Sequence, residues 1–172
     1  MKIPLEAVKS LREKTGAPLG DVRSALEAAE GNETKARELL QRKGFEAAMK
    51  RQDRATGMGR VESYIHHDGR VGVLVEVNCE TDFVARLPEF QQFCRGVAMQ
   101  IASQHPACVK PSELPEHAPR TSCLLEQPFI KDSGQTIGQL LTVLIAKTGE
   151  NIVIRRFMRF ALGEDHDSAP KT

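Results

Sequence analysis

Hydrophobic and polar positions divide the chain into a helical first part and a mixed second part. Across residues 5–44, apolar side chains recur every three or four positions, which is typical of amphipathic helices. The pattern predicts three short helices. The first ends at Thr15–Gly16, the second is capped by Asp21, and the third runs over residues 32–44. We therefore expect a compact three-helix bundle over residues 1–44.

Residues 45–59 connect this bundle to the rest of the chain. Ala, Lys and Arg dominate the segment and its apolar positions are few, which predicts a linker helix. Gly57 and Gly59 follow, and glycines loosen a chain because they restrict the backbone least. We expect a linker helix and hinge over residues 45–59, a domain boundary there, and relative motion of the two parts.

A period of two replaces the helical period after this boundary. Residues 61–67 alternate, and Asp68–Gly69 favours a tight two-residue hairpin turn before residues 71–78. Four β-branched side chains fall on one face of that second strand and should be buried: Val71, Val73, Val75 and Val77. The sequence thus predicts an antiparallel hairpin with one apolar face.

The following segments supply two helices and a proline-rich connection. Pro88 begins an amphipathic helix that ends before His105–Pro106. Residues 106–119 contain four prolines without periodicity, which indicates an extended linker over the surface. A second amphipathic helix is predicted over residues 137–148, with Gly149 as its stop.

A last strand is predicted over residues 151–160, beside the hairpin. Strict alternation would place two sets of side chains on its opposite faces: Ile152, Ile154, Met158 and Phe160 against Val153, Arg155, Phe157 and Arg159. Residues 124–129 are expected to add a short extended piece. The fold class is therefore α+β, with an N-terminal three-helix bundle, a linker helix, and a three-stranded antiparallel sheet packed with helices over residues 60–163. Residues 164–172 are polar and should form a disordered tail.

Composition and charge narrow the classes of function. The 172 residues carry a formal net charge of +1, which argues against duplex nucleic acid as a direct ligand. No apolar run approaches the roughly 20 residues that span a bilayer, and the N-terminus lacks the apolar segment of a signal peptide. We expect a cytoplasmic protein without membrane contact. The cysteines form no C-x-x-C pair and should be free thiols, without a metal site or cofactor: Cys79, Cys94, Cys108 and Cys123.

The turn after the second strand carries the candidate chemistry. Asn78 to Asp82 lacks periodicity and favours a turn, and Phe83 stands at its tip. Phe83 either folds back into the core, which is the commoner position for an aromatic, or stands on the surface as the anchor for a partner. The residues alone leave both readings open.

A catalytic site near this turn is disfavoured. Its members would be His66, His67, Cys79, Glu80 and Asp82. The two histidines are adjacent in a strand, so their side chains point to opposite faces and cannot serve one metal ion or one thiol. The sequence also contains no serine elbow, P-loop or dinucleotide-binding fingerprint.

The arginines of the last strand offer two further readings. Arg155, Arg156 and Arg159 would suit a nucleic-acid patch, but arginines beside acidic neighbours more often form a solvated or salt-bridged face. Arg155, Phe157 and Arg159 on one face would also suit a dimer contact. A sheet of three strands leaves an exposed edge and an incompletely covered face.

Several segments resemble the elongation factor Ts family, and they occur in the family's order. They are VKSLREKTGAPLGDVRSALEAAEGNETKARELL, YIHHDGRVGVLVEVN, NCETDFVAR, LLEQPFIKD and GENIVIRRFMRF. The resemblance implies a guanine-nucleotide exchange factor of translation, not an enzyme, that binds elongation factor Tu in its GDP-bound and nucleotide-free states. The N-terminal bundle then resembles the ubiquitin-associated type.

The resemblance also assigns partner-binding residues in the TDFV turn. In the family, the phenylalanine of this turn wedges between two helices of Tu and displaces groups that hold Mg²⁺ and the phosphates. The preceding aspartate contacts nearby residues. Phe83 and Asp82 match these positions and are flanked by Thr81 and Val84.

A second contact is implied in the bundle, where the family touches the nucleotide-binding domain of Tu. Arg12 matches the family's arginine on the first helix, and Leu19 matches an apolar residue of the following turn. Gly20 departs from the large side chain that is common there. The family members also carry further helical residues within the region of residues 106–128, so this chain is shortened.

A single core unit resembles the short type of the family, which pairs into a homodimer. A cysteine of the last strand can bridge that dimer, but Met158 occupies the place here, so this disulfide is not expected. The alternative function is a plain adaptor that binds a peptide or ubiquitin-like partner through residues 1–44.

Overall fold

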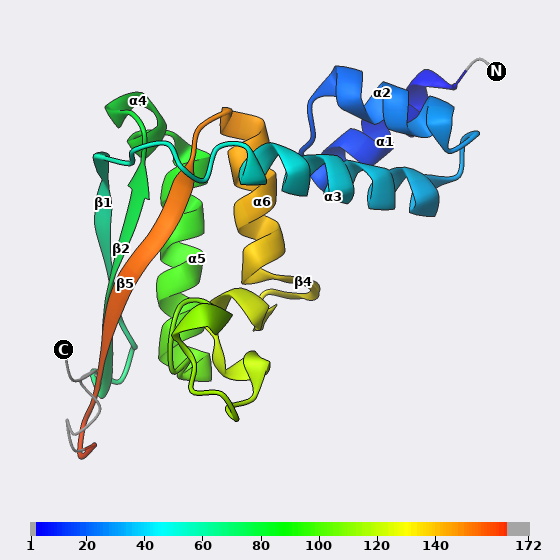
Figure 1. The fold of residues 1–172 in the computed structure, drawn as a ribbon. Coiled ribbons are helices and arrows are strands. Elements are labelled where there is room, and N and C mark those ends of the chain that lie inside the picture. Colours follow the sequence, from blue (N-terminus) through cyan, green and yellow to red (C-terminus); the bar gives the residue numbers. More distant parts are fainter. Residues whose placement is uncertain (1–2, 165–172) are drawn as a thin grey trace.

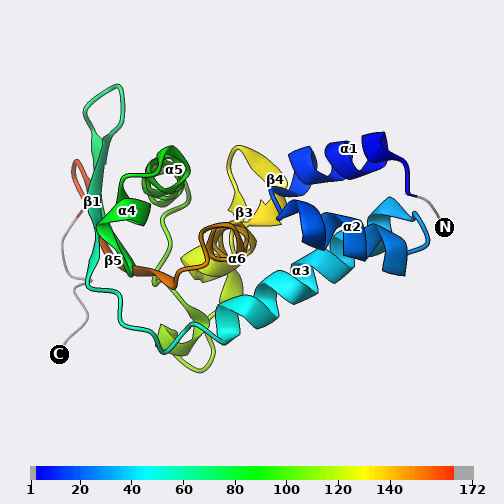
Figure 2. The ribbon, with the colours of Figure 1, turned by 90° about the horizontal axis from the view of Figure 1, so that it is seen from above.

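The computed structural model describes residues 3–164 and places a helical bundle and a β-sheet at opposite ends, with two long helices between them (Figures 1 and 2). The bundle comprises α1 (Leu5–Thr15), α2 (Leu19–Ala28) and α3 (Glu33–Met49). Their apolar faces form a small core: Val8, Leu11, Val22, Ala25, Leu26, Ala29, Ala36 and Leu40. The expected tail over residues 164–172 lies outside the described residues, apart from Glu164.

Two predicted helix boundaries in the bundle are wrong. Gly44 does not end α3, so the expected linker helix is the continuation of α3. A glycine inside a helix costs only about 1 kcal/mol relative to alanine and does not end the helix by itself. A Cβ at Gly44 would lie 3.4 Å from Thr142 Cγ2, which shows how closely α3 approaches α6. Helix α2 begins at Leu19, and Asp21 pairs with Lys43 at 2.8 Å and does not cap it.

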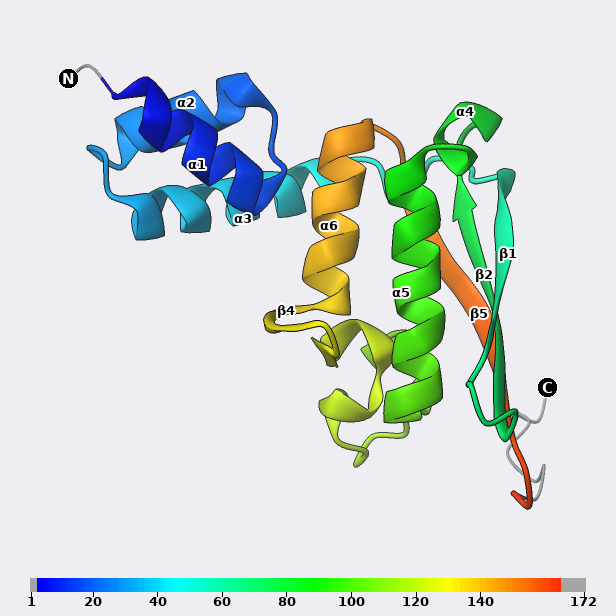
Figure 3. The same ribbon diagram turned by 180° about the vertical axis from the view of Figure 1, so that it is seen from behind.

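The second part is built on a three-stranded antiparallel sheet in the order β1-β2-β5, which confirms the α+β class. The strands are β1 (Met58–Ile65), β2 (Val71–Cys79) and β5 (Ile152–Ala161). Helix α5 (Pro88–Gln104) covers one face, and α6 (Ile137–Thr148) lies beyond α5 and contacts α3 (Figures 1 and 3). The core between sheet and helices includes Val73, Val75, Val77, Cys79, Phe90, Cys94, Val97, Ile101, Leu144, Ile152 and Ile154.

The hairpin places polar β1 residues against this core and apolar ones outside. Register with β2 turns Glu62 and Tyr64 inward, whereas Val61 and Ile65 are 63% and 66% exposed on the outer face. The connection is longer than predicted. Its loop covers residues 67–70 and is closed by a hydrogen bond from His66 N to the Val71 carbonyl at 2.8 Å.

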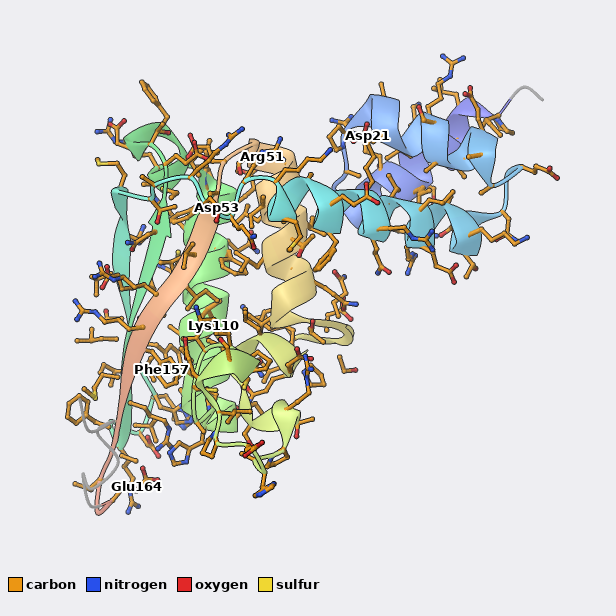
Figure 4. All side chains as sticks on the ribbon, in the orientation of Figure 1. Asp21, Arg51, Asp53, Lys110, Phe157 and Glu164 are labelled. Atoms are coloured by element: carbon orange, nitrogen blue, oxygen red, sulfur yellow. The ribbon has the colours of Figure 1, made fainter. Side chains whose placement is uncertain are left out.

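Strand β5 contains a bulge that the alternation did not predict. Glu76 pairs with Arg156 but Val77 pairs with Ile154, so Arg155 is the extra residue. The bulge reverses the faces beyond it. Phe157, marked on β5 in Figure 4, and Arg159 turn toward the helices, while Met158 and Phe160 turn outward. The predicted grouping of these side chains is therefore wrong.

The segment between α5 and α6 is more structured than a surface linker. It contains the short 3-10 helices Pro111–Glu113, Arg120–Ser122 and Leu124–Glu126, and a small sheet of β3 (Pro128–Phe129) and β4 (Asp132–Thr136). Val109 and Leu124 are buried in the main core. Because this segment has no helical or strand periodicity, the sequence pattern did not predict that these two side chains are buried.

The expected hinge is tied to the sheet. Arg51, labelled in Figure 4, donates from Nε to the Gly149 carbonyl at 2.9 Å, and Asn151 Nδ2 donates to the carbonyls of Gln52 and Arg54. Gly59 is a residue of β1 with a φ of 141°, and a Cβ on it would overlap the Val77 carbonyl oxygen. The hinge prediction is therefore wrong at Gly59, where glycine permits close strand pairing.

Gly59→Ala should lower the free energy of unfolding by about 2 kcal/mol or more, because alanine neither tolerates this φ nor fits beside β2. Gly57→Ala is the matched control. A Cβ there meets nothing within 4 Å, so its effect should stay below about 1 kcal/mol. Urea unfolding of both variants measures the difference, and equal effects would contradict this description of Gly59.

Candidate functional site

The predicted turn is a single helical turn at the end of the sheet. Strand β2 ends at Cys79, and α4 (Asp82–Ala85) follows after two residues and lies beside the start of α5 (Figure 3). Thr81 caps α4: its backbone is still extended, and its Oγ1 accepts the Val84 N–H at 3.4 Å. A threonine at this point therefore turns the chain from strand to helix.

Glu150 holds the backbone that leads into α4. Its Oε2 accepts the N–H groups of Glu80 and Thr81, each at 3.1 Å, and its Oε1 accepts the Thr81 hydroxyl at 2.6 Å. Glu80 makes a hydrogen bond in the opposite direction along the chain: its Oε1 accepts the Asn151 N–H at 2.6 Å. Cys79 and Ile152 are paired in the sheet, so these carboxylates cross between the adjoining ends of β2 and β5. Hydrogen bonds to ionised acceptors are the stronger kind.

The side chains of α4 divide between core and solvent. Val84 is 6% exposed and belongs to the main core, which fixes the rotation of the turn. Successive residues of a helix point about 100° apart, so Phe83 faces another direction. Phe83 is 77% exposed, which excludes the reading in which its ring folds back into the core. Asp82 pairs with Arg86 at 2.8 Å on the surface.

The alternative catalytic group is not assembled. His66 and His67 lie at the hairpin loop, whereas Cys79 and Glu80 lie at the other end of β2. A strand of that length separates them by about 30 Å. Burial raises the pKa of the Cys79 thiol, and its Sγ donates to the Thr81 carbonyl at 3.1 Å. Residues 3–164 contain no group of three side chains suited to hold a metal ion.

The contact residues predicted in the bundle lie far from α4. Arg12 on α1 and Leu19 at the start of α2 are exposed, Leu19 by 51%. A Cβ added at Gly20 would meet nothing within 4 Å, so the surface has room for the larger side chain that is common in the family. Bundle and α4 stand at opposite ends of the molecule, with α5 and α6 between them (Figure 1). The exposed residues predicted to bind a partner therefore lie in two separate regions.

The arginines of β5 form ion pairs, as expected for a salt-bridged face. Arg155 and Arg156 bind the two carboxylate oxygens of Glu76 at 3.1 and 2.7 Å, and Arg159 binds Glu164 at 2.7 Å. The hydrogen bond from Arg156 is the main reason that the pKa of Glu76 lies below its usual value. These charges are compensated, which weakens the case for a nucleic-acid patch.

Sequence reasoning missed Glu150, which binds the turn from the start of the neighbouring strand β5. The available signal was its place directly after the helix stop Gly149 and before the last strand. An antiparallel partner strand begins where its neighbour ends, so residues that precede β5 lie beside residues that follow β2. The contact of Glu150 with the turn can be inferred only once β5 is known to lie next to β2, and the sequence did not give that strand order.

Within the described chain, residues 3–164, no helix is both long and apolar enough to cross a membrane.

Glu150→Gln should lower the free energy of unfolding by about 1–2 kcal/mol and speed hydrogen exchange at the Thr81 amide, because an amide has one acceptor oxygen in place of two. Glu89→Gln removes an exposed ion pair with Lys147 and should cost less than about 1 kcal/mol, without affecting Thr81. Chemical unfolding and amide exchange by NMR distinguish the variants. An unchanged Thr81 amide in Glu150→Gln would show that the carboxylate does not hold the turn.

Comparison with known proteins agrees with the resemblance found in the sequence. Residues 8–121 match the family model described as elongation factor TS. The elongation factor Ts of Rubrobacter xylanophilus is 44% identical over 195 residues, covering 94% of this chain and 100% of that protein. Those of Carboxydothermus hydrogenoformans and Solidesulfovibrio magneticus are 45% and 43% identical, with 90% and 98% of each covered. The first alignment is longer than the 172 residues of this chain, so that relative carries residues absent here. The chain belongs to the elongation factor Ts family of translation elongation factors.

Proposed function

We propose that this protein promotes release of GDP from elongation factor Tu by inserting Phe83 beside the site that holds Mg²⁺ and the phosphates. One observation carries the proposal: Phe83 is 77% exposed on a turn whose backbone is bound by Glu150. Family membership supports the partner and the exchange role. The protein makes and breaks no covalent bond in this scheme.

The geometry suits a wedge. Thr81 caps the turn, and Val84 is anchored in the core, so the backbone that carries Phe83 is ordered before any partner binds. An anchor ordered in advance loses little conformational entropy on binding, and a large rigid ring supplies much apolar area. In this proposal Phe83 enters between two helices of Tu, and Asp82 contacts residues next to them.

Exchange follows from reciprocal coupling between two ligands of Tu. If insertion of Phe83 weakens the grip on GDP, then GDP must weaken the binding of this protein to the same degree. The factor therefore binds nucleotide-free Tu most tightly and dissociates when a new nucleotide enters. Arg12 and Leu19 provide a second contact that holds the factor on the nucleotide-binding domain while α4 acts, although Gly20 contributes no side chain to it.

The outer face of the sheet supports the expected homodimer. Leu74 pairs with Met158, and Gly72 lies between Ile65 and Phe160, so apolar side chains of three strands adjoin there. Ile65, Leu74 and Met158 are 66%, 49% and 52% exposed. A contiguous exposed apolar patch on a sheet is typical of a protein interface. Met158 and Phe160 replace Phe157 and Arg159 as the proposed dimer residues, because the bulge turns the latter pair inward.

Phe83→Ala should leave the free energy of unfolding unchanged within about 0.5 kcal/mol, because the ring makes few contacts inside its own domain. Stimulated release of labelled GDP from Tu in a stopped-flow assay should fall by about thirtyfold or more, the loss expected for a central anchor residue. Phe45→Ala removes an exposed phenylalanine of α3 and serves as the matched control, with release expected to be retained. Full activity of Phe83→Ala would refute the wedge.

Leu74→Glu should convert a dimer into a monomer, since it introduces a carboxylate into each copy of the apolar patch that the interface would bury. Leu5→Glu changes an exposed leucine of α1 and should leave the mass unchanged. Sedimentation equilibrium at micromolar concentration measures both. A wild-type monomer, or a Leu74→Glu dimer, would eliminate this face as the interface.

A further inference from the structure

Cys108 and Cys123 lie opposite each other at the base of the proline-rich segment. They form a parallel bridge, with hydrogen bonds from Leu124 N to the Cys108 carbonyl at 2.9 Å and from Ala107 N to the Ser122 carbonyl at 2.8 Å. Their sulfur atoms are 2.9 Å apart. Residues that face each other across such a bridge have Cα and Cβ separations within the range that a disulfide spans.

The fold holds this pair in place on both sides. Val109 follows Cys108, Leu124 follows Cys123, and both apolar side chains are buried in the main core. Cys123 is itself fully buried, whereas Cys108 is half-buried and reachable from solvent. Cys79 and Cys94 belong to β2 and α5, away from this bridge. Within residues 3–164, no third metal-binding side chain joins the pair.

We propose that Cys108 and Cys123 form a reversible disulfide by exchange with a low-molecular-weight disulfide. The Cys108 thiolate, being the accessible one, attacks a sulfur of the small disulfide and releases one small thiolate. The Cys123 thiolate then attacks Cys108 Sγ and releases the second. Two protein thiols lose two protons and two electrons, and the small disulfide takes them up as two small thiols.

The surroundings of Cys108 make this a slow reaction. Burial, and then the neighbouring Cys123 thiol, raises the pKa of Cys108 to about 12. Only the thiolate attacks, so the pair stays reduced unless the oxidant persists. Once formed, the disulfide closes residues 108–123 into a loop and restricts the open states of the proline-rich segment.

The linkage is separate from nucleotide exchange. The pair follows the C-terminal end of α5, whereas α4 precedes its N-terminal end, and a helix of this length spans about 25 Å. Lys110, labelled in Figure 4, follows Cys108 in the same segment and lies below α4 in that view. The disulfide should therefore stiffen one segment without changing stimulated GDP release.

The test treats the full-length protein with oxidised glutathione at about pH 8.5, where attacking thiolate is more abundant. Mass spectrometry of a non-reducing digest should find Cys108 joined to Cys123, with Cys79 and Cys94 free. Hydrogen exchange at the Leu124 amide, which bonds to the Cys108 carbonyl, should slow by roughly 100-fold, as closing a loop of this length implies. Dithiothreitol should reverse both changes.

Two variants complete the experiment. Cys108→Ser should abolish the linked peptide and the slowed exchange, while Cys94→Ser, which alters a buried thiol on α5, should retain both. Stable glutathione adducts on Cys108, intermolecular links, or thiols that remain free under these conditions would each overturn the proposal. None of these outcomes bears on the role of Phe83.

Discussion

The end of the protein that carries α4 depends on carboxylate hydrogen bonds exchanged between the ends of two strands. Glu150, just before β5, binds the backbone after β2, and Glu80, just after β2, binds the backbone of Asn151. Main-chain groups beyond the end of a sheet have lost their ladder partners, and an unpaired buried group costs free energy. Here the carboxylates supply the missing partners. The chain can therefore leave the sheet in a defined direction and begin α4 at once.

Three of the four residues of the TDFV turn make contacts within the protein, and these contacts leave the ring of Phe83 exposed. Thr81 caps the helix, Val84 packs in the core, and Asp82 pairs with Arg86 on the surface. The cap and the packed valine fix the backbone, and none of the three contacts uses the ring of Phe83. A large aromatic left 77% exposed by so ordered a turn is well placed to bind a partner. A wedge requires an exposed ring on a backbone that is already fixed, and Phe83 meets both requirements.

Local sequence patterns predicted most helices and strands. The features that they did not predict depend on contacts between segments far apart in the chain. The helix stop at Gly149 was predicted because it depends on neighbouring residues only. Of the four valines predicted to be buried on β2, Val73, Val75 and Val77 are buried, whereas Val71 at the start of the strand is half-buried. Gly44 was misread because packing of α3 on α6 overrides its low helix propensity. The bulge at Arg155 reversed the faces of Met158 and Phe160, since strict alternation contains no information about pairing. Of the site, the sequence predicted the turn with Phe83 at its tip, but its residues alone left open whether the ring is buried or exposed. Glu150 required knowledge that β5 adjoins β2.

In the proposed function, Glu150 serves exchange by holding Phe83 in place, and a double-mutant cycle can test this link. Stimulated GDP release from elongation factor Tu would be measured for Phe83→Ala, Glu150→Gln and the double variant under the same conditions. If the two residues act as one unit, their effects are strongly non-additive, and the double variant loses no more activity than Phe83→Ala alone. Losses that multiply independently would mean that Glu150 acts by another route and does not serve exchange by holding Phe83.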